Sequence, residues 1–106
     1  MKITGGIYMF ITIVGTSHYF GTEIFKVGQN LWLEKDVNND YDEEAIKVVT
    51  EAGATVGYVA NSVYSVAKGT RSAGRIYDTF EGRQKISVCF IVKNDVIAQI
   101  DDEISF

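Results

Sequence analysis

The chain has 106 residues, of which 46% are hydrophobic and 23% charged, and its formal net charge at pH 7 is −4. These values are typical of one globular domain and exclude a disordered or fibrous chain. The excess of acidic residues also excludes a protein that binds nucleic acid with a surface that is positively charged throughout. The single cysteine leaves no intramolecular disulfide and no cysteine-based metal cluster, which fits a reducing cytoplasm.

Residues 1–7 are predicted to be a flexible lead-in to a single domain that spans residues 8–106. The longest apolar run, from Ile7 to Val14, is far shorter than the roughly 20 residues that cross a bilayer. No small-residue cleavage pattern follows this run, so we expect neither a signal peptide nor a membrane segment. The sequence therefore predicts a cytoplasmic protein.

Strands are predicted where short runs rich in Val, Ile, Thr, Tyr and Phe lie between glycines. The predicted strands are Tyr8–Gly15, Leu31–Lys35, Ala45–Thr50, Thr55–Val59, Arg75–Phe80, Lys85–Val92 and Val96–Gln99, with a hairpin turn at residues 51–54. Near the C-terminus, every second residue from Ile86 through Val88 and Phe90 to Val92 is apolar. This alternation predicts that all four side chains share one strand face.

One helix is predicted to begin at the cap residue Asn61 and to end at Gly69, because Val63, Val66 and Ala67 recur at helical spacing between them. A second short turn is predicted at residues 42–45, where acidic residues favour a helix start. Many short strands with one or two short helices predict a mainly β fold, and in particular a small β-barrel.

Charge is distributed unevenly along the chain. Residues 36–67 carry a net charge of −5, whereas residues 68–85 carry a net charge of +3. The second segment is therefore where a phosphate group could bind. Its candidate phosphate contacts are Lys68, Arg71 and Arg75.

The densest polar segment runs from Asp36 to Glu44, and three interpretations of it stay open. Asp36, Asn38 and Asp40 have the spacing of the first calcium ligands of an EF-hand, although Tyr41 takes the place of its glycine and Lys47 that of its bidentate glutamate. Alternatively, the side chains cap a turn, or they bind a ligand. The two departures speak against calcium, and we assign no metal or cofactor.

A ring-bearing segment, His18-Tyr19-Phe20, lies between Gly15 and Gly21. Three consecutive rings cannot all face one core, so at least one should be exposed for stacking or for contact with a partner. Tyr58 and Asn61 either face a shared groove or serve as a core ring and a helix cap. No nucleophile motif accompanies His18, so we assign no catalytic residue.

These segments together resemble the HIRAN domain family. The resemblance rests on Val14-Gly15-x-x-x-Tyr19-x-Gly21, Gly28 with Leu31-x-Leu33, Asn38-Asn39-x-Tyr41-Asp42-x-x-Ala45-Ile46-x-Val48, and Val56-Gly57-Tyr58-Val59. The stretch from Tyr58 to Asp78 is similar to the small stand-alone bacterial members. The resemblance implies an OB-like β-barrel that binds DNA without enzymatic activity, in a family often fused to remodelling ATPases.

The best understood branch of this family binds the 3′ end of single-stranded DNA. The resemblance implies that His18 and Tyr19, with Phe20 beside them, lie on the segment that stacks on bases. It places Asn38, Asn39 and Tyr41 on the loop that holds the terminal nucleotide, and Asp42 on the residue that accepts a hydrogen bond from the 3′-hydroxyl. The chain departs from that branch at Ser17 and at Ala60-Asn61, where basic residues are expected.

We therefore expect a nucleic-acid-binding module for single-stranded DNA ends or for damaged or stalled DNA, acting alone or beside a separate ATPase or helicase. The alternative is a protein-interaction or self-assembly module that does not bind DNA, because an exposed ring cluster on an acidic surface could dock a partner. The sequence does not determine the oligomeric state.

Overall fold

The structure, a computed structural model, describes residues 8–101, so the predicted lead-in at residues 1–7 and the last five residues lie outside it. The described residues form six strands: β1 (Phe10–Val14), β2 (Asn30–Lys35), β3 (Ile46–Val49), β4 (Thr55–Val59), β5 (Arg83–Val92) and β6 (Asp95–Ile100). They also form one short α-helix, α1 (Ala73–Ile76), and two 3₁₀ turns, η1 (Thr16–His18) and η2 (Tyr77–Thr79). The prediction of a mainly β fold with short helices is confirmed.

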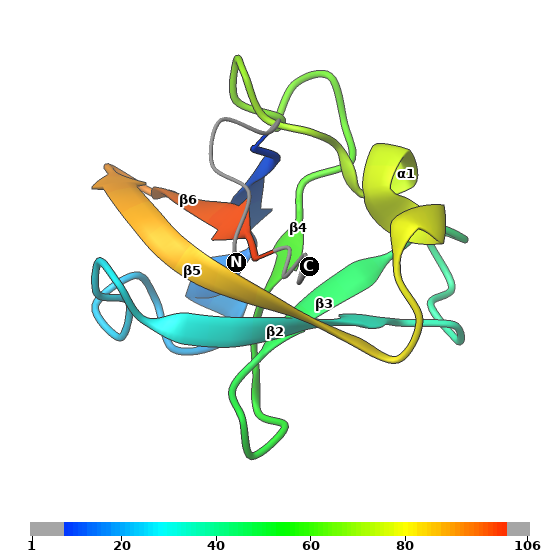
Figure 1. Cartoon of the computed structure of the whole chain (residues 1–106), viewed down its shortest axis with the longest axis horizontal. Coiled ribbons are helices and arrows are strands. Elements are labelled where there is room, and N and C mark those ends of the chain that lie inside the picture. Colours follow the sequence, from blue (N-terminus) through cyan, green and yellow to red (C-terminus); the bar gives the residue numbers. More distant parts are fainter. Residues whose placement is uncertain (1–7, 102–106) are drawn as a thin grey trace, which may run out of the picture.

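The six strands close into an antiparallel barrel in the order β1-β4-β3-β2-β5-β6 (Figure 1). Closure follows because β1 pairs with β4 on one side and with β6 on the other. Strands β3 and β4 are joined by the predicted hairpin turn, in which the Thr50 backbone N–H donates to the Ala54 carbonyl at 2.9 Å. The predicted small barrel is confirmed.

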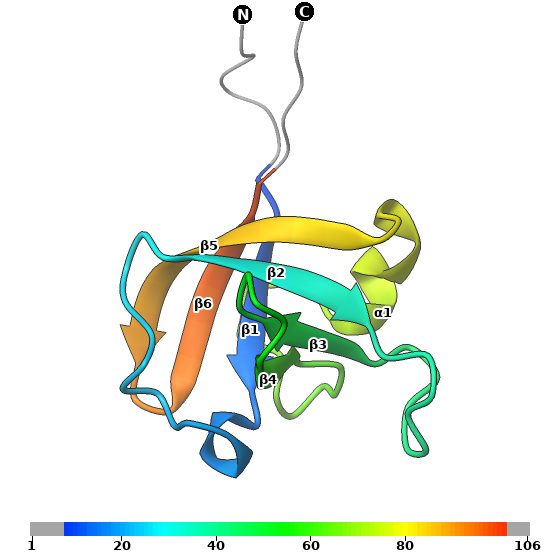
Figure 2. The same cartoon turned by 90° about the horizontal axis from the view of Figure 1, so that it is seen from below.

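The core fills the barrel interior with inward-facing residues from all six strands. Leu31 and Leu33 of β2 are buried, as are Val96 and Ala98 of β6. Helix α1 lies at one side of the barrel, next to the beginning of β3 (Figures 1 and 2), and buries Ala73 and Ile76. Within residues 8–101, no helix has the length and apolar character that a membrane crossing requires.

The helix predicted from Asn61 to Gly69 is wrong, because this segment forms a succession of turns. The serine side chains compete with the helical backbone pattern. The Ser62 Oγ accepts the Tyr64 backbone N–H at 3.1 Å, and the Ser65 hydroxyl donates to the Ser62 carbonyl at 3.2 Å. Farther along, the Ala67 backbone N–H donates to Thr12 Oγ1 on β1, which draws the chain away from a helical course.

The strand predicted at Arg75–Phe80 is also wrong, because the chain there forms α1 and η2. Ser72 is the N-cap of α1, and its side chain accepts the Arg75 backbone N–H at 3.3 Å. The buried residues Ala73, Ile76 and Phe80 are spaced by three and four, which is the period of a helix. The sequence therefore contained a cap and a helical face that the β-rich composition outweighed.

The prediction that Ile86, Val88, Phe90 and Val92 share one apolar face holds only for its first half. Ile86 and Val88 are buried, but Phe90 and Val92 are exposed. The register between β5 and β6 shifts between Val88 and Phe90, which marks a β-bulge at the intervening residue. An extra residue in one strand reverses the alternation of inward and outward side chains beyond it. The C-terminal part of β5, which we call its outer half, therefore points Phe90 and Val92 outward.

Candidate functional site

A shallow pocket of about 450 Å³ lies where the β2–β3 loop, the end of β4 and the following turn meet. Five of the predicted site residues line it, together with Ala45, Val59, Ser62 and Ser65, which sequence reasoning did not select as site residues. The five are Asn39, Tyr41, Asp42, Tyr58 and Asn61. The fold thus brings together residues that are up to 22 positions apart in the chain.

The β2–β3 loop is shaped by Asn39. Its Oδ1 atom accepts the backbone N–H groups of Tyr41 and Asp42, at 2.9 and 3.0 Å, while its Nδ2 atom donates to Asp36 at 3.1 Å. An asparagine that binds the backbone two and three residues ahead forms a local turn without help from the rest of the fold. The turn-capping interpretation of this segment is confirmed for Asn39, and also for Asp42, whose Oδ1 atom accepts the backbone N–H two residues ahead.

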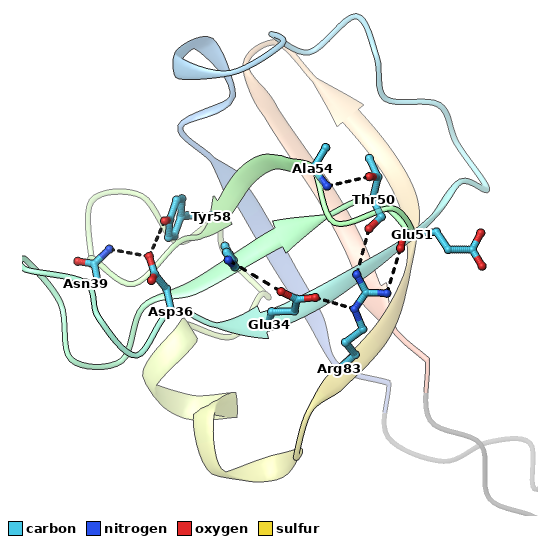
Figure 3. Close-up of polar contacts among 9 residues, drawn as sticks. Glu34, Asp36, Asn39, Thr50, Glu51, Ala54, Tyr58 and Arg83 are labelled. Carbon is cyan, nitrogen blue, oxygen red and sulfur yellow. Dashed lines mark hydrogen bonds and ion pairs between the residues drawn. The ribbon is translucent and has the colours of Figure 1, made fainter.

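Asp36 and Tyr58 tie that loop to the barrel wall. The Tyr58 hydroxyl donates to Asp36 Oδ2 at 2.6 Å, beside the bond from Asn39 (Figure 3). The hydrogen bond from Tyr58, and to a smaller extent that from Asn39, holds the pKa of the Asp36 carboxyl below its ordinary value, because both bonds stabilise the charged form. The same bond raises the pKa of Tyr58. Asp36 is a positioning residue for the pocket that sequence reasoning considered only as a metal ligand.

The Asp42 carboxylate is held in place from both sides. Its Oδ1 atom accepts the Glu44 backbone N–H at 2.9 Å, and its Oδ2 atom accepts a hydrogen from Asn61 Nδ2 at 2.8 Å. Both donors are neutral, so neither cancels the charge of the carboxylate. Because each carboxylate oxygen has two lone pairs, Asp42 keeps the capacity to accept a further hydrogen bond from a ligand.

Asn61 is itself oriented by helix α1. Its Oδ1 atom accepts the Gly74 backbone N–H at 2.8 Å, so its amide nitrogen must face Asp42. The approach is close, since a Cβ atom on Gly74 would lie 2.6 Å from Glu44 Oε1 and 3.3 Å from Asn61 Oδ1. The expected helix cap is therefore a link between the pocket and a helix that begins twelve residues later.

The three rings of the predicted stacking segment take different positions. Tyr19 lies against Tyr58, with ring centroids 6.3 Å apart, and so borders the pocket wall. Phe20 instead lines a separate hollow of about 510 Å³ beside η1 and the β5–β6 turn. His18 is exposed, as are both other rings. The expectation that at least one ring would be exposed is confirmed.

The predicted residues Asn38 and Tyr41 are exposed in the β2–β3 loop. Asn38 is exposed, and Tyr41 is exposed over 98% of its surface although it lines the pocket. A tyrosine ring in this position offers both faces to the solvent. It is therefore available for stacking on a flat ligand such as a base.

The basic segment does not line this pocket. Among the described residues that do line it, there is no lysine or arginine. Lys68 lines a different groove, and the backbone N–H of Arg71 donates to the Phe10 carbonyl on β1. Arg75 is exposed on α1, next to the Gly74 that contacts Asn61.

The family model of the HIRAN domain matches residues 7–87 of this chain. Two solved structures are similar to it in fold, each with a TM-score of 0.61. A protein from Lactobacillus plantarum is 21% identical, with 89% of this chain and 91% of that chain covered. The HIRAN domain of human HLTF is 23% identical, with 88% of this chain and 74% of that chain covered. No curated protein matches the chain significantly.

Proposed function

This chain belongs to the HIRAN domain family, whose members are known as DNA-binding modules, and from this premise we propose that its pocket binds the 3′ end of single-stranded DNA. It acts by binding, without a reaction, a metal or a cofactor of its own. Residues 8–106 form the single domain that does so, alone or beside a separate ATPase or helicase.

The observation that carries the proposal is the arrangement of Asp42. Its carboxylate lies in an open pocket, is fixed by Glu44 and Asn61, and retains free lone pairs. A fixed carboxylate accepts a hydrogen bond from a hydroxyl group and repels a phosphate. Such a group distinguishes a free 3′-hydroxyl from a phosphorylated end.

The rings around the pocket support the same ligand. Tyr41 is fully open to solvent at the rim, and Tyr19 lies against Tyr58 in the wall. Base stacking on such rings contributes roughly 1–3 kcal/mol per base and does not depend on sequence. The module therefore binds the terminal nucleotides whatever their bases are.

The charges around the pocket make this binding weak. The net charge of −5 over residues 36–67 surrounds the site, and no lysine or arginine is among its described lining residues. Arg75 lies next to Gly74, whose backbone N–H donates to Asn61 of the pocket lining, and is a candidate phosphate contact on that side. Binding at physiological salt is accordingly weaker than in a site that neutralises several phosphates.

Fluorescence anisotropy with three single strands of equal length tests the proposal. One carries a 3′-hydroxyl, one a 3′-phosphate, and one is circular and has no end. At low salt, the strand with the hydroxyl end should have a higher affinity than the other two. Equal affinity for all three, or binding to none, would exclude end recognition.

A second candidate function is a protein-interaction or self-assembly module. It is favoured by the same lack of basic residues in the pocket lining, together with exposed apolar side chains such as Phe20 and Val63. Size-exclusion chromatography with light scattering, across a hundredfold range of concentration, distinguishes the two functions. A concentration-dependent dimer that binds no DNA would favour self-assembly.

A further inference from the structure

A second groove, of about 370 Å³, lies on the outer face of β1, β5 and β6 and shares no lining residue with the pocket. Phe10 and Ile97 are in its lining, together with Phe90 and Val92 of the outer half of β5. The loop of residues 67–70 supplies the remaining side, including Lys68. The two charged residues in this lining are Lys68 and Asp95.

This groove is a built feature of the fold. Its apolar side exists because the bulge in β5 turns Phe90 and Val92 outward. Its loop side is fastened to β1: the Ala67 backbone N–H donates to Thr12 Oγ1 at 3.1 Å, and the hydroxyl groups of Thr12 and Thr70 are 2.8 Å apart. Because both sides are held by the barrel, the groove is preformed rather than a gap beside a mobile loop.

The chemistry of the groove suits a single nucleic-acid strand. Phe90 is 59% exposed and presents a ring, while Lys68 and Arg71 belong to a loop that has no acidic residue from Ala67 to Tyr77. Exposed rings interleaved with cations are the usual surface for binding single strands without sequence preference. Within the groove lining, Asp95 offsets Lys68, so the exposed ring and the closeness of the groove to the pocket, rather than net charge, favour a nucleic-acid strand.

The groove and the pocket lie on either side of one short segment. Ser65 is in the pocket lining and Ala67 is in the groove lining, so their Cα atoms are at most about 7 Å apart. Tyr64, which is 97% exposed, lies just before Ser65 on the turn that adjoins the pocket. A strand that leaves the pocket over this turn reaches the groove directly.

We infer that a single strand whose 3′ end occupies the pocket continues across residues 62–66 into this groove, where Phe90 stacks on a base and Lys68 contacts a phosphate. The inference rests on the proposed function of the pocket. It extends the ligand from a terminal nucleotide to a single strand of several nucleotides, and it gives Lys68 a role that the pocket alone does not provide.

The test compares two oligonucleotides, dT3 and dT12, each with a 5′ fluorescent label and a 3′-hydroxyl. The wild type should bind dT12 more tightly than dT3. Phe90→Ala should weaken dT12 binding by at least about fivefold and leave dT3 binding unchanged. Lys68→Gln should do the same and lower the slope of log affinity against log salt by about 0.7 for dT12 alone.

Matched controls are Val27→Ala for the apolar change and Lys85→Gln for the charge change. Both side chains are exposed, and neither is in the lining of the groove or the pocket. Neither control should alter the affinity for dT12. Because Phe90 and Lys68 are exposed, both test variants should fold, which circular dichroism verifies.

The outcomes separate the two proposals. If dT12 binds with 3′-hydroxyl preference but neither Phe90→Ala nor Lys68→Gln weakens it, the groove proposal is overturned and the pocket proposal stands. If those variants weaken dT12 binding while a 3′-phosphate has no effect, the groove binds DNA and end recognition fails. If the wild type binds neither oligonucleotide, both proposals fail, and a protein ligand becomes the better account of the groove.

Discussion

Asp42→Asn is the substitution that most directly examines how the pocket works. The Asp42 carboxylate serves three hydrogen-bond donors in the proposed complex: the Glu44 backbone N–H, the amide of Asn61 and the ligand hydroxyl. An asparagine offers one acceptor oxygen and a nitrogen that only donates. Asn61 cannot rotate its amide to compensate without losing the bond from Gly74. At least one of the three bonds must therefore be lost.

The magnitude follows from the kind of bond. A hydrogen bond to a charged group contributes about 1.5–3 kcal/mol, against about 0.5–1.5 kcal/mol between neutral groups. At about 1.4 kcal/mol for each factor of ten, loss of the bond to the ligand weakens binding of a 3′-hydroxyl end roughly ten- to hundredfold. Binding of a 3′-phosphate end should stay constant or improve, since the substitution removes the repelling charge.

Anisotropy titrations of both ends with the wild type and the variant measure this change in selectivity. The matched control is Asp40→Asn, because Asp40 is an exposed acid of the same loop outside the pocket lining, and its substitution changes the net charge equally. The expected result is that the preference for the hydroxyl end collapses in Asp42→Asn only. Equal effects of the two substitutions would refute the reasoning, because they would show that general charge decides the preference.

Three further substitutions examine how the fold supports the site. Tyr58→Phe removes the hydroxyl that lowers the pKa of Asp36, so the free energy of unfolding should fall by about 1 kcal/mol at pH 7. This loss should shrink as the pH falls through the lowered pKa of Asp36, as urea denaturation at several pH values will show, because the favoured carboxylate is then protonated. Gly57→Ala should cost about 1–3 kcal/mol in thermal unfolding, since the new Cβ atom would lie 2.8 Å from Ile13 Cγ2. Ser72→Ala removes the N-cap of α1 and should cost about 0.5–2 kcal/mol in urea denaturation.

Each of these three predictions has a result that contradicts it. A Tyr58→Phe effect that is constant from neutral to acidic pH would show that the hydroxyl does not act on the charge of Asp36. Wild-type stability for Gly57→Ala would show that β1 and β4 approach less closely than described. Unchanged stability for Ser72→Ala would show that burial of Ala73 and Ile76 holds α1 without its cap.

The sequence by itself determined most of the barrel. Runs of β-forming residues between glycines predicted six strands to within a few residues, and the turn at residues 51–54 was predicted as well. The loop around Asn39 was also predictable, because an asparagine side chain bonds to its own neighbours in the chain. These features share a cause: each depends on interactions between residues that are close in sequence.

In two segments the sequence contained correct local indications of structure that a stronger overall residue pattern outweighed. Ser72 and the apolar spacing behind it marked a helix, but Arg75–Phe80 is rich enough in β-forming residues to suggest a strand. The serines of the segment after Asn61 marked turns, although its valines have helical spacing. In both segments, hydrogen bonds of single side chains outweighed the average preference of the residues.

Only the tertiary structure decided how the candidate site is assembled. The bulge that turns Phe90 outward, the bond from Tyr58 to Asp36 and the bond from Gly74 to Asn61 all join residues from different elements. Tertiary structure also placed the basic residue Lys68 outside the lining of the pocket. Local patterns cannot contain these results, because strand register and loop docking depend on how distant parts of the chain pack together in one core.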